Sequence, residues 1–423
     1  IFRFRFYRFG EWVEVVVDDY LPTKNRRLIY AHSKNPKEMW CSLLEKAYAK
    51  LRKCYEALEG GLSSDALVDL TGAVPETIQL NSDDEDGILK KMGEKKLIAM
   101  MKVAIKEKTL MSCSIDVLED EIQQERLPNG LVVGHAYGIT NIQVLRVGST
   151  FKKNEIILVR LHNPWGEVEW NGPWSDKSPK WNDISNSNRK QLGFTIADDG
   201  DFWMSFQDFI SNFSTLTICR CINTSLLTFG RRWHGVMFRG EWSIENETAG
   251  GCINNAETFY QNPQYSIRIH KPTFLIISLM QQDNHVEIGA EKITIGFILL
   301  KVELNRKYRI HKPTYETAGR VTYINIREVT ERIFLKPGHY ILIPSSYDVG
   351  EEGSYFMRLF SSNSINIRLL KNDSPKRKWY YPLFYHGKPY FIGIVRVQIL
   401  GGQFKRHIDK TYIKITFMDF KKK

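Results

Sequence analysis

The chain has 423 residues, of which 43% are hydrophobic, and this composition excludes a disordered or collagen-like protein. At about 100–200 residues per domain, the length predicts two to four domains. The formal net charge is +11, but no basic run exceeds three residues, so the charges predict a solvated surface and no nucleic-acid partner. No apolar run approaches the roughly 18 residues of a transmembrane helix.

Cysteine usage and the first residues bear on the compartment. The six cysteines are few for this length and include no C-x-x-C pair. The opening residues, Ile1-Phe2-Arg3, show neither an initiator methionine nor the layout of a signal peptide. We therefore expect reduced thiols in a cytoplasmic protein, and we expect the chain to be a fragment of a longer one.

The N-terminal part combines a strand pattern with a helix pattern. Residues 12–17 alternate like a β-strand. A helix is predicted to start at Asn35, an N-cap residue that is followed by Pro36 and by Glu38 in the first turn. The Gly60-Gly61 pair is predicted to end this helix.

Beyond a second predicted helix at 88–106, the pattern changes to strands, first at 131–135 and 156–160. After residue 224 the helical period disappears. Short apolar runs separated by polar turns then predict a β-sandwich, and they lie at 274–277, 293–297 and 340–343.

The last part of the chain predicts a linker and the start of another domain. Residues 371–378 are polar and basic, which is typical of a linker, and a new strand pair opens at 392–397. About 35 residues are too few to close a sandwich, so we expect this last domain to be truncated.

Two polar residues at predicted strand ends are candidates for chemistry. His135 lies in an apolar run, where a lone histidine is usually a core residue, and Asn163-Pro164 alone predicts only a turn. Together they predict a His and an Asn presented side by side, as the Cys–His–Asn class of thiol protease requires. Trp165 would shield their hydrogen bond from water.

The sequence around these residues resembles the calpain family of cysteine proteases. The match is collinear over about residues 1–365, and its most specific words are Gly134-His135-Ala136-Tyr137, Asn163-Pro164-Trp165-Gly166 and Phe202-Trp203-Met204-Ser205. Conventional calpains continue into EF-hand loops, whose spacing is absent here. The tail instead resembles a C2 domain, as in the C2-bearing members of the family, so no EF-hand partner subunit is implied.

The resemblance implies an α+β papain-like protease core, partial, followed by an all-β C2-like sandwich and the start of a C2 domain. The implied boundaries are 1–72 for the rear part of core subdomain 1, 73–223 for subdomain 2, 224–365 for the sandwich, 366–388 for a linker and 389–423 for the truncated C2 domain.

The resemblance also implies site roles. His135 would be the general base, Asn163 its orienting partner and Trp165 the shield, while Gly61 and Gly134 would offer backbone groups to the substrate. The family's nucleophilic cysteine opens a helix in a context that none of the six cysteines has. We therefore expect the nucleophile upstream of this chain, and no thiol catalysis by the chain alone.

Calcium is the cofactor that the resemblance implies. Taken alone, Asp199-Gly200-Asp201 is a solvated turn. In the family these positions match a calcium site, and the implied ligands are Glu169, Asp176, Asp199, Asp201 and the carbonyl of Ala197, with Glu38 as a ligand of a companion site.

The function that follows is a calcium-dependent intracellular cysteine endopeptidase acting on protein substrates. One alternative is a catalytically dead calpain-like pseudoprotease that binds the cytoskeleton or another partner. A second is a β-sandwich protein that binds lipid or a partner protein, and the basic segment 306–312 could face an anionic membrane.

Overall fold

The computed structural model describes residues 1–35, 37–80, 93–117, 124–149, 152–166, 168–197, 199–224, 232–282, 292–312 and 315–373. Residues 1–371 form one compact unit. The predicted C2 segment 389–423, Pro36 and residues 88–92 of the second predicted helix lie outside the described residues. No helix among the described residues is long and apolar enough to cross a membrane.

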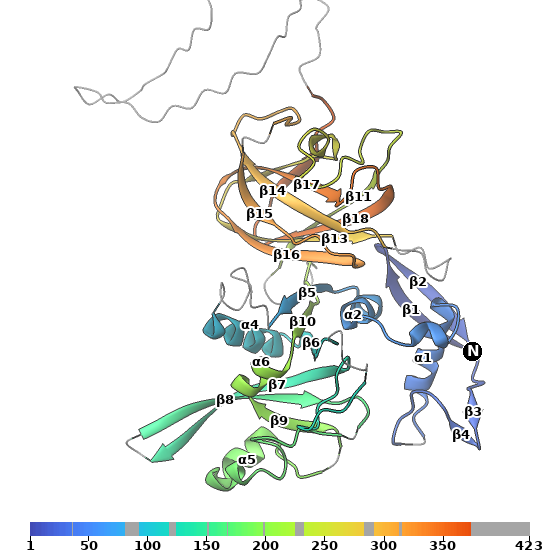
Figure 1. The fold of residues 1–423 in the computed structure, drawn as a ribbon, viewed down its shortest axis with the longest axis vertical. Helices are drawn as coiled ribbons and strands as arrows, with labels where there is room; N and C mark the ends of the chain where they lie inside the picture. The colour runs from blue at the N-terminus through green and yellow to red at the C-terminus, as the bar shows by residue number, and fades with distance from the viewer. Residues whose placement is uncertain are drawn as a thin grey trace, which may run out of the picture. The chain divides into compact units, whose positions relative to one another are not determined.

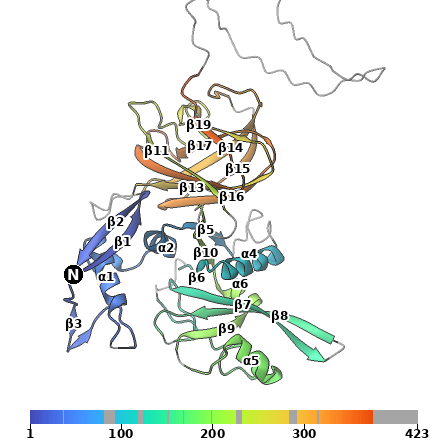
Figure 2. The same cartoon turned by 180° about the vertical axis from the view of Figure 1, so that it is seen from behind.

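A β-hairpin and two helices form the N-terminal part (Figure 2). Phe9 and Gly10 both have positive φ, 44° and 89°, as the commonest two-residue hairpin turn requires. The hairpin packs on the first helix through Phe6, Val15 and Ala47. The elements are β1 (Phe2–Arg8), β2 (Glu11–Val17), β3 (Thr23–Lys24), β4 (Arg27–Leu28), α1 (Trp40–Leu51), the 3₁₀ turn η1 (Glu56–Leu58) and α2 (Ser63–Thr71).

The predicted bounds of the first helix are wrong. It starts at Trp40, and the Asn35 side chain accepts from the amide of Lys37 in a local turn instead of capping the helix. It ends at Leu51, because Lys53 has a φ of 87° and Tyr55 stacks on Tyr30 with ring centroids 4.3 Å apart. The Gly60-Gly61 pair therefore lies in a loop, and α2, which the sequence analysis missed, follows it.

An antiparallel six-stranded sheet forms the middle of the chain (Figure 1), in the order β5-β10-β6-β7-β8-β9. Helices α4 and α6 cover one face, where Leu97, Met101 and Phe209 are buried against it. Trp181 and Leu192 pack on Trp203 at the other face, beside α5. The elements are β5 (Val74–Gln79), α4 (Glu94–Lys106), β6 (Leu110–Ser114), β7 (Ala136–Ser149), β8 (Lys152–His162), η2 (Pro179–Asp183), α5 (Asn186–Leu192), β9 (Asp201–Ser205), α6 (Phe206–Asn212) and β10 (Thr215–Arg220).

The strand predicted at 131–135 is also wrong, because Val132 makes only an isolated bridge to Arg126, residues 133–134 form a turn and β7 begins at Ala136. Gly134 has a φ of 64° and donates its amide to the carbonyl of Ile115 at 2.8 Å. A left-handed residue of this kind interrupts an extended strand and reorients the residue that follows. His135 therefore lies immediately before the first residue of β7 and outside its pairing with the neighbouring strands.

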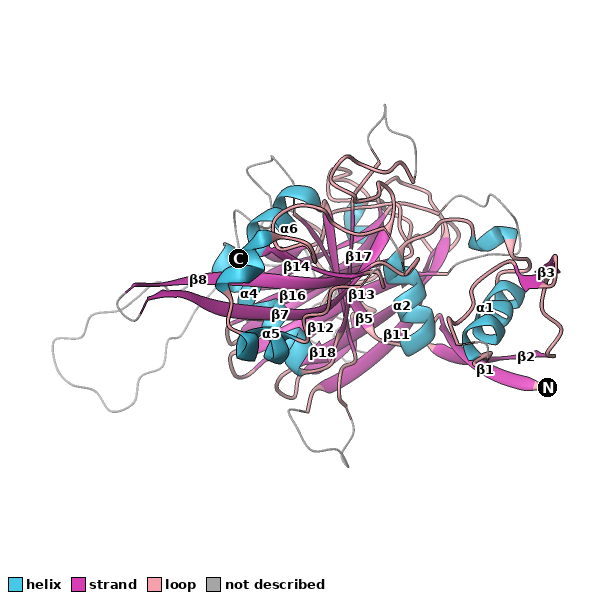
Figure 3. Ribbon diagram, turned by 90° about the horizontal axis from the view of Figure 1, so that it is seen from below, coloured by secondary structure: helices cyan, strands magenta, loops and turns pink. Residues whose placement is uncertain are grey.

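Two packed sheets follow, as the sequence predicts for a β-sandwich, and strands dominate the view in Figure 3. Their orders are β11-β18-β13-β16 and β15-β14-β17-β12-β19. One core joins them, with Leu279, Phe297 and Met357 fully buried. The elements are β11 (His234–Trp242), η3 (Phe259–Gln261), β12 (Tyr265–Ile269), β13 (Thr273–Gln281), β14 (Ile295–Val302), β15 (Glu316–Arg320), β16 (Glu328–Leu335), β17 (Gly338–Ser346), β18 (Gly353–Ser361) and β19 (Asn366–Leu369).

Two features of the sandwich differ from expectation. Strand β19 extends the sandwich past residue 365, because it pairs with β12, so any linker begins after it. The basic segment 306–312 is partly internal. Arg306 is 7% exposed and pairs with Glu303, and Arg309 donates to three backbone carbonyls of 260–262. These contacts leave less of the segment for a membrane surface.

Candidate active site

His135 and Asn163 lie side by side at the shared end of β7 and β8. These strands pair antiparallel, with Gly138 opposite His162, so the residues just outside the ladder are brought together. The Nε2 atom of His135 lies 2.8 Å from the Oδ1 atom of Asn163. His135 is 9% exposed and Asn163 is fully buried, so this hydrogen bond is largely shielded from water.

Two further contacts fix the side-chain amide of Asn163 and with it the tautomer of the histidine. Asn163 donates Nδ2 to the carbonyl of Val168 at 2.9 Å, and its Oδ1 accepts the amide of Trp165 at 3.1 Å. The oxygen therefore faces His135, and an amide oxygen can only accept. Nε2 of His135 must carry the proton, which leaves the lone pair on Nδ1 as a base.

Aromatic rings enclose the imidazole. Trp165 lies 4.3 Å from it between ring centroids, and Tyr137 meets it edge-on at 5.1 Å. Burial is the larger cause that lowers the pKa of His135 below its ordinary value, and the hydrogen bond to Asn163 opposes it. The imidazole is therefore neutral near pH 7, as a general base must be.

The turn at 199–201 holds the backbone of Asn163 through a hydrogen bond, a role that the sequence did not predict. The amide of Asn163 donates to the carbonyl of Gly200 at 2.8 Å. The carboxylate of Glu169 holds the turn by accepting the amides of Asp199 and Gly200 at 3.1 and 2.9 Å. Hydrogen bonds thus run from Glu169 through Gly200 and Asn163 to His135.

The four carboxylates expected to bind calcium gather at this turn, but each accepts protein donors. Asp176 accepts the amide of Ala197 at 3.0 Å, so the described contact of Ala197 is through N–H. Asp201 pairs with Arg160 at 2.8 Å and with His162 at 2.9 Å. The side chains described here include no group of three or more His, Cys, Asp or Glu arranged to hold a metal ion. Calcium would therefore have to displace protein donors that these carboxylates accept in this structure.

Crowding of negative charge is nevertheless visible at the turn. Burial, the largest cause, raises the pKa of Asp176, and the nearby carboxylates of Asp199 and Asp201 add to the rise. The companion ligand expected at Glu38 lies elsewhere, where its carboxylate accepts from Ser33 at 2.9 Å and from Asn35 at 3.2 Å.

The two glycines expected to contact substrate have different surroundings. Gly134 immediately precedes His135. Gly61 has a φ of 135° and would have no atom within 4 Å of an added Cβ, so its backbone is open. Gly60 and Gly61 line a cavity of about 610 Å³ between α1 and α2, together with Trp40, Leu44 and Leu62.

All six cysteines are free, and the structure explains why three of them are poor nucleophiles. Burial raises the pKa of Cys113 well above its ordinary value, raises the pKa of Cys219 to about 12 and raises the pKa of Cys221. A catalytic thiol needs the opposite shift, because the thiolate is the reactive form. The hydrogen bonds described for His135 and for the cysteines do not join them.

Comparisons with known proteins agree with the geometry. Residues 1–220 match the model of the calpain family cysteine protease, and residues 238–360 match the model of the calpain large subunit, domain III. Calpain-5 of Mus musculus is 42% identical over 392 residues, covering 89% of this chain and 60% of that protein. Calpain-9 of Rattus norvegicus is 40% identical, with 85% and 52% covered, and Calpain-A of Drosophila melanogaster is 39% identical, with 88% and 46% covered.

The chain thus spans about half to three fifths of the length of these curated relatives. Both family models match in the order found along the chain, the protease model over the hairpin, helices and six-stranded sheet, and the domain III model over the sandwich. The chain belongs to the calpain family.

Proposed function

We propose that the whole protein is a cysteine endopeptidase in which His135 is the general base and Asn163 orients it. The observation that carries this proposal is the 2.8 Å hydrogen bond from His135 to an amide whose own contacts assign the tautomer. A neutral imidazole held by a buried amide, with Nδ1 available, is what thiol activation requires.

In the proposed reaction, Nδ1 of His135 takes the proton of a thiol, and the thiolate attacks the carbonyl carbon of a peptide bond. The resulting imidazolium returns the proton to the leaving amine, and water then hydrolyses the acyl-enzyme. Asn163 holds the ring in one orientation throughout, and Trp165 covers their hydrogen bond. The thiol would come from outside the six cysteines of this chain, in a papain-like core of which residues 1–223 form part.

We further propose calcium as a regulator of the turn at 199–201 and the cytoplasm as the compartment. The Asp201 carboxylate is bonded to Arg160 and His162 in this structure. To bind calcium, it would have to release both side chains. The support is the oxygen chemistry of the four carboxylates and their mutual crowding. Protein substrates follow from the family.

The test uses the full-length gene product and a quenched-fluorescence peptide or casein substrate. His135→Ala should lower kcat by several orders of magnitude, since it removes the base. Asn163→Ala should lower kcat less, because it only orients the base. His32→Ala is the matched control, because His32 is exposed, its described hydrogen bond is to the carbonyl of Tyr30, and the change should leave turnover unchanged.

Two results would decide against the proposal. A full-length protein that folds but neither turns over substrate nor reacts with a thiol-directed inhibitor would favour the pseudoprotease alternative. Turnover that survives His135→Ala would remove this histidine from the mechanism. The 423-residue chain alone should hydrolyse no peptide, and cysteine-dependent hydrolysis by it would contradict the assignment of the nucleophile.

A further inference from the structure

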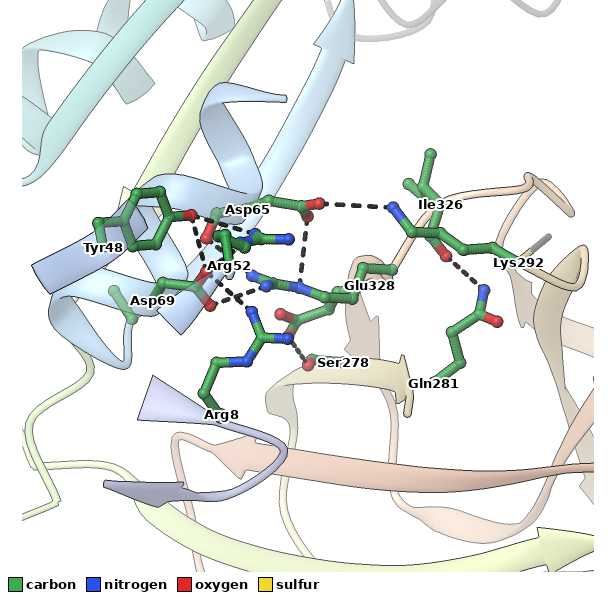
Figure 4. Close-up of polar contacts among 12 residues, drawn as sticks. Arg8, Tyr48, Arg52, Asp65, Asp69, Ser278, Gln281, Lys292, Ile326 and Glu328 are labelled. Carbon is green, nitrogen blue, oxygen red and sulfur yellow. Dashed lines mark hydrogen bonds and ion pairs between the residues drawn. The ribbon is translucent and has the colours of Figure 1, made fainter. Parts of the chain in front are cut away.

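One buried carboxylate collects three guanidinium groups from three separate segments. Asp69 of α2 is fully buried, and Figure 4 shows it among Arg8, Arg52 and Tyr48. Its Oδ2 accepts from Arg8 at 3.0 Å, from Arg52 at 3.1 Å and from the Tyr48 hydroxyl at 2.9 Å. Its Oδ1 accepts from Arg327, which precedes β16 of the sandwich, at 2.7 Å.

The pair Asp69–Arg52 closes the loop that carries Gly60 and Gly61. Arg52 is the C-cap of α1, directly before the loop, and Asp69 lies in α2, directly after it. Both flanks of residues 53–62 are therefore tied to the same carboxylate. Arg52 and Asp65 line the same cavity as the two glycines, so the cluster borders the open face of the loop.

The sandwich holds α2 along its length. Arg327 also donates to the backbone carbonyl of Asp65 at 2.7 Å, and Lys292 lies 3.7 Å from the carboxylate of Asp65. Arg358 of β18 donates to the carbonyls of Gly72 and Ala73 at 2.8 and 3.1 Å. These carbonyls lie at the C-terminal end of α2, where helix acceptors lack partners and a cation is favoured.

Apolar contacts complete the joint. Val68 of α2 and Tyr7 of β1 pack with Met280 of β13 and Phe356 of β18 in one buried cluster. Arg327 is 2% exposed and Arg358 is 1% exposed, so their charges are satisfied by the partners described and little by water. Removing one partner of such a pair leaves a buried charge uncompensated, which opens the structure locally.

We propose that the β-sandwich positions the Gly60-Gly61 loop, and that Arg327 is the positioning residue that transmits this through Asp69 to Arg52. The mechanical part of this proposal, that the sandwich holds the loop in place through Arg327, Asp69 and Arg52, rests on the contacts described above. Only its consequence for substrate rests on the proposed function, since the loop would form one edge of the peptide-binding site. The sandwich would then help to set the shape of the peptide-binding site in the protease domain.

The first experiment is hydrogen–deuterium exchange of the 423-residue chain, followed in peptides that cover 53–62. The amides of Leu58 and Glu59, bonded to the carbonyls of Tyr55 and Glu56 at 2.9 and 3.1 Å, supply the signal. In Arg327→Met they should exchange about tenfold faster or more. Arg327→Lys keeps a charge but not the forked contact, and should give a smaller increase.

Arg306→Met is the matched control. Arg306 is also a buried arginine of the sandwich, paired with Glu303, but it contacts neither α2 nor the loop in the described structure. It should destabilise the sandwich and leave exchange at 53–62 unchanged. Wild-type exchange of this loop in both Arg327 variants, or equal acceleration in Arg306→Met, would overturn the proposal. If Arg327→Met does not fold, Arg327→Lys against Arg306→Lys decides the question in the same way.

The second experiment separates the loop from the chemistry. In the full-length protein, Arg327→Lys should raise KM for a peptide substrate severalfold with kcat nearly unchanged, because the base His135 is untouched. An equal fall in kcat with constant KM would refute the substrate part. A wild-type protein without turnover would refute the proposed function instead, while the exchange result still decides the mechanical part.

Discussion

Replacing Gly200 by alanine is the sharpest test of the support behind Asn163. Gly200 has a φ of 87°, and an added Cβ would lie 2.6 Å from the carbonyl oxygen of Asn163 and 2.9 Å from the Cα of Gly166. Both contacts are with backbone, which cannot swing aside as a side chain could. The alanine should therefore push the turn away from Asn163 and weaken the hydrogen bond that Gly200 accepts.

The magnitude has two parts. A left-handed alanine costs about 1–2 kcal/mol in backbone strain, and the overpacking adds about 1–3 kcal/mol. Unfolding entropy is about 2.1 cal/mol/K per residue, so the unit of residues 1–371 has an unfolding entropy of about 0.8 kcal/mol/K. The sum predicts a fall in Tm of about 3–6 °C.

Gly193→Ala is the matched control. Gly193 also has a left-handed backbone, with a φ of 62°, but the nearest atom to an added Cβ is 3.9 Å away, on the Arg160 side chain. Only the backbone strain applies, which predicts a fall of about 1–3 °C.

The assay combines calorimetry with NMR of the imidazole of His135, whose Nε2 proton is bonded to Asn163 in the wild-type protein. Gly200→Ala should shift or broaden this proton signal, and Gly193→Ala should not. If both variants melt alike and both keep the wild-type imidazole signal, the turn does not support Asn163.

Three further predictions concern the same region. Asn163→Ala should lower the pKa of His135 further, because it removes the hydrogen bond that opposes the effect of burial, and an NMR titration of the imidazole measures this shift. Because its folded-state pKa lies below the ordinary histidine value, His135 contributes to folding stability above that ordinary value. This contribution is lost as pH falls through the lower folded-state pKa. Tyr137→Phe removes the hydroxyl that accepts the buried amide of Val132 at 2.9 Å, and it should lower the free energy of unfolding by about 1–3 kcal/mol, measured by thermal unfolding. Tyr20 is 82% exposed, so Tyr20→Phe should change the free energy of unfolding little. Terbium luminescence should saturate, disappear in Asp199→Ala with Asp201→Ala, and tighten in Arg160→Met, which frees Asp201; binding that persists in the double variant would refute the calcium residues.

Local sequence signals predicted some elements well and others poorly. The strand at 12–17 and the sandwich runs are found in β2, β13, β14 and β17, since alternation and short apolar runs are local properties. The first helix was predicted too long, because Asn35, Pro36 and Glu38 have the sequence pattern of an N-cap. In the structure Asn35 instead forms a local turn and the helix begins at Trp40. Helix α2 was missed, although Gly72, with a φ of 67° at its end, is a C-cap signal that could have found it.

The sequence by itself determined the family words around His135 and Asn163, the all-β character after residue 224 and the absence of a reactive-cysteine context. Tertiary structure decided which atoms meet. Pairing of β7 with β8 brings His135 to Asn163, the turn at Gly200 supports that asparagine, and Arg327 reaches Asp69 across 258 residues of chain. No local pattern carries such pairings, because a hydrogen bond or ion pair depends on where folding places both partners, while propensity and periodicity describe only near neighbours.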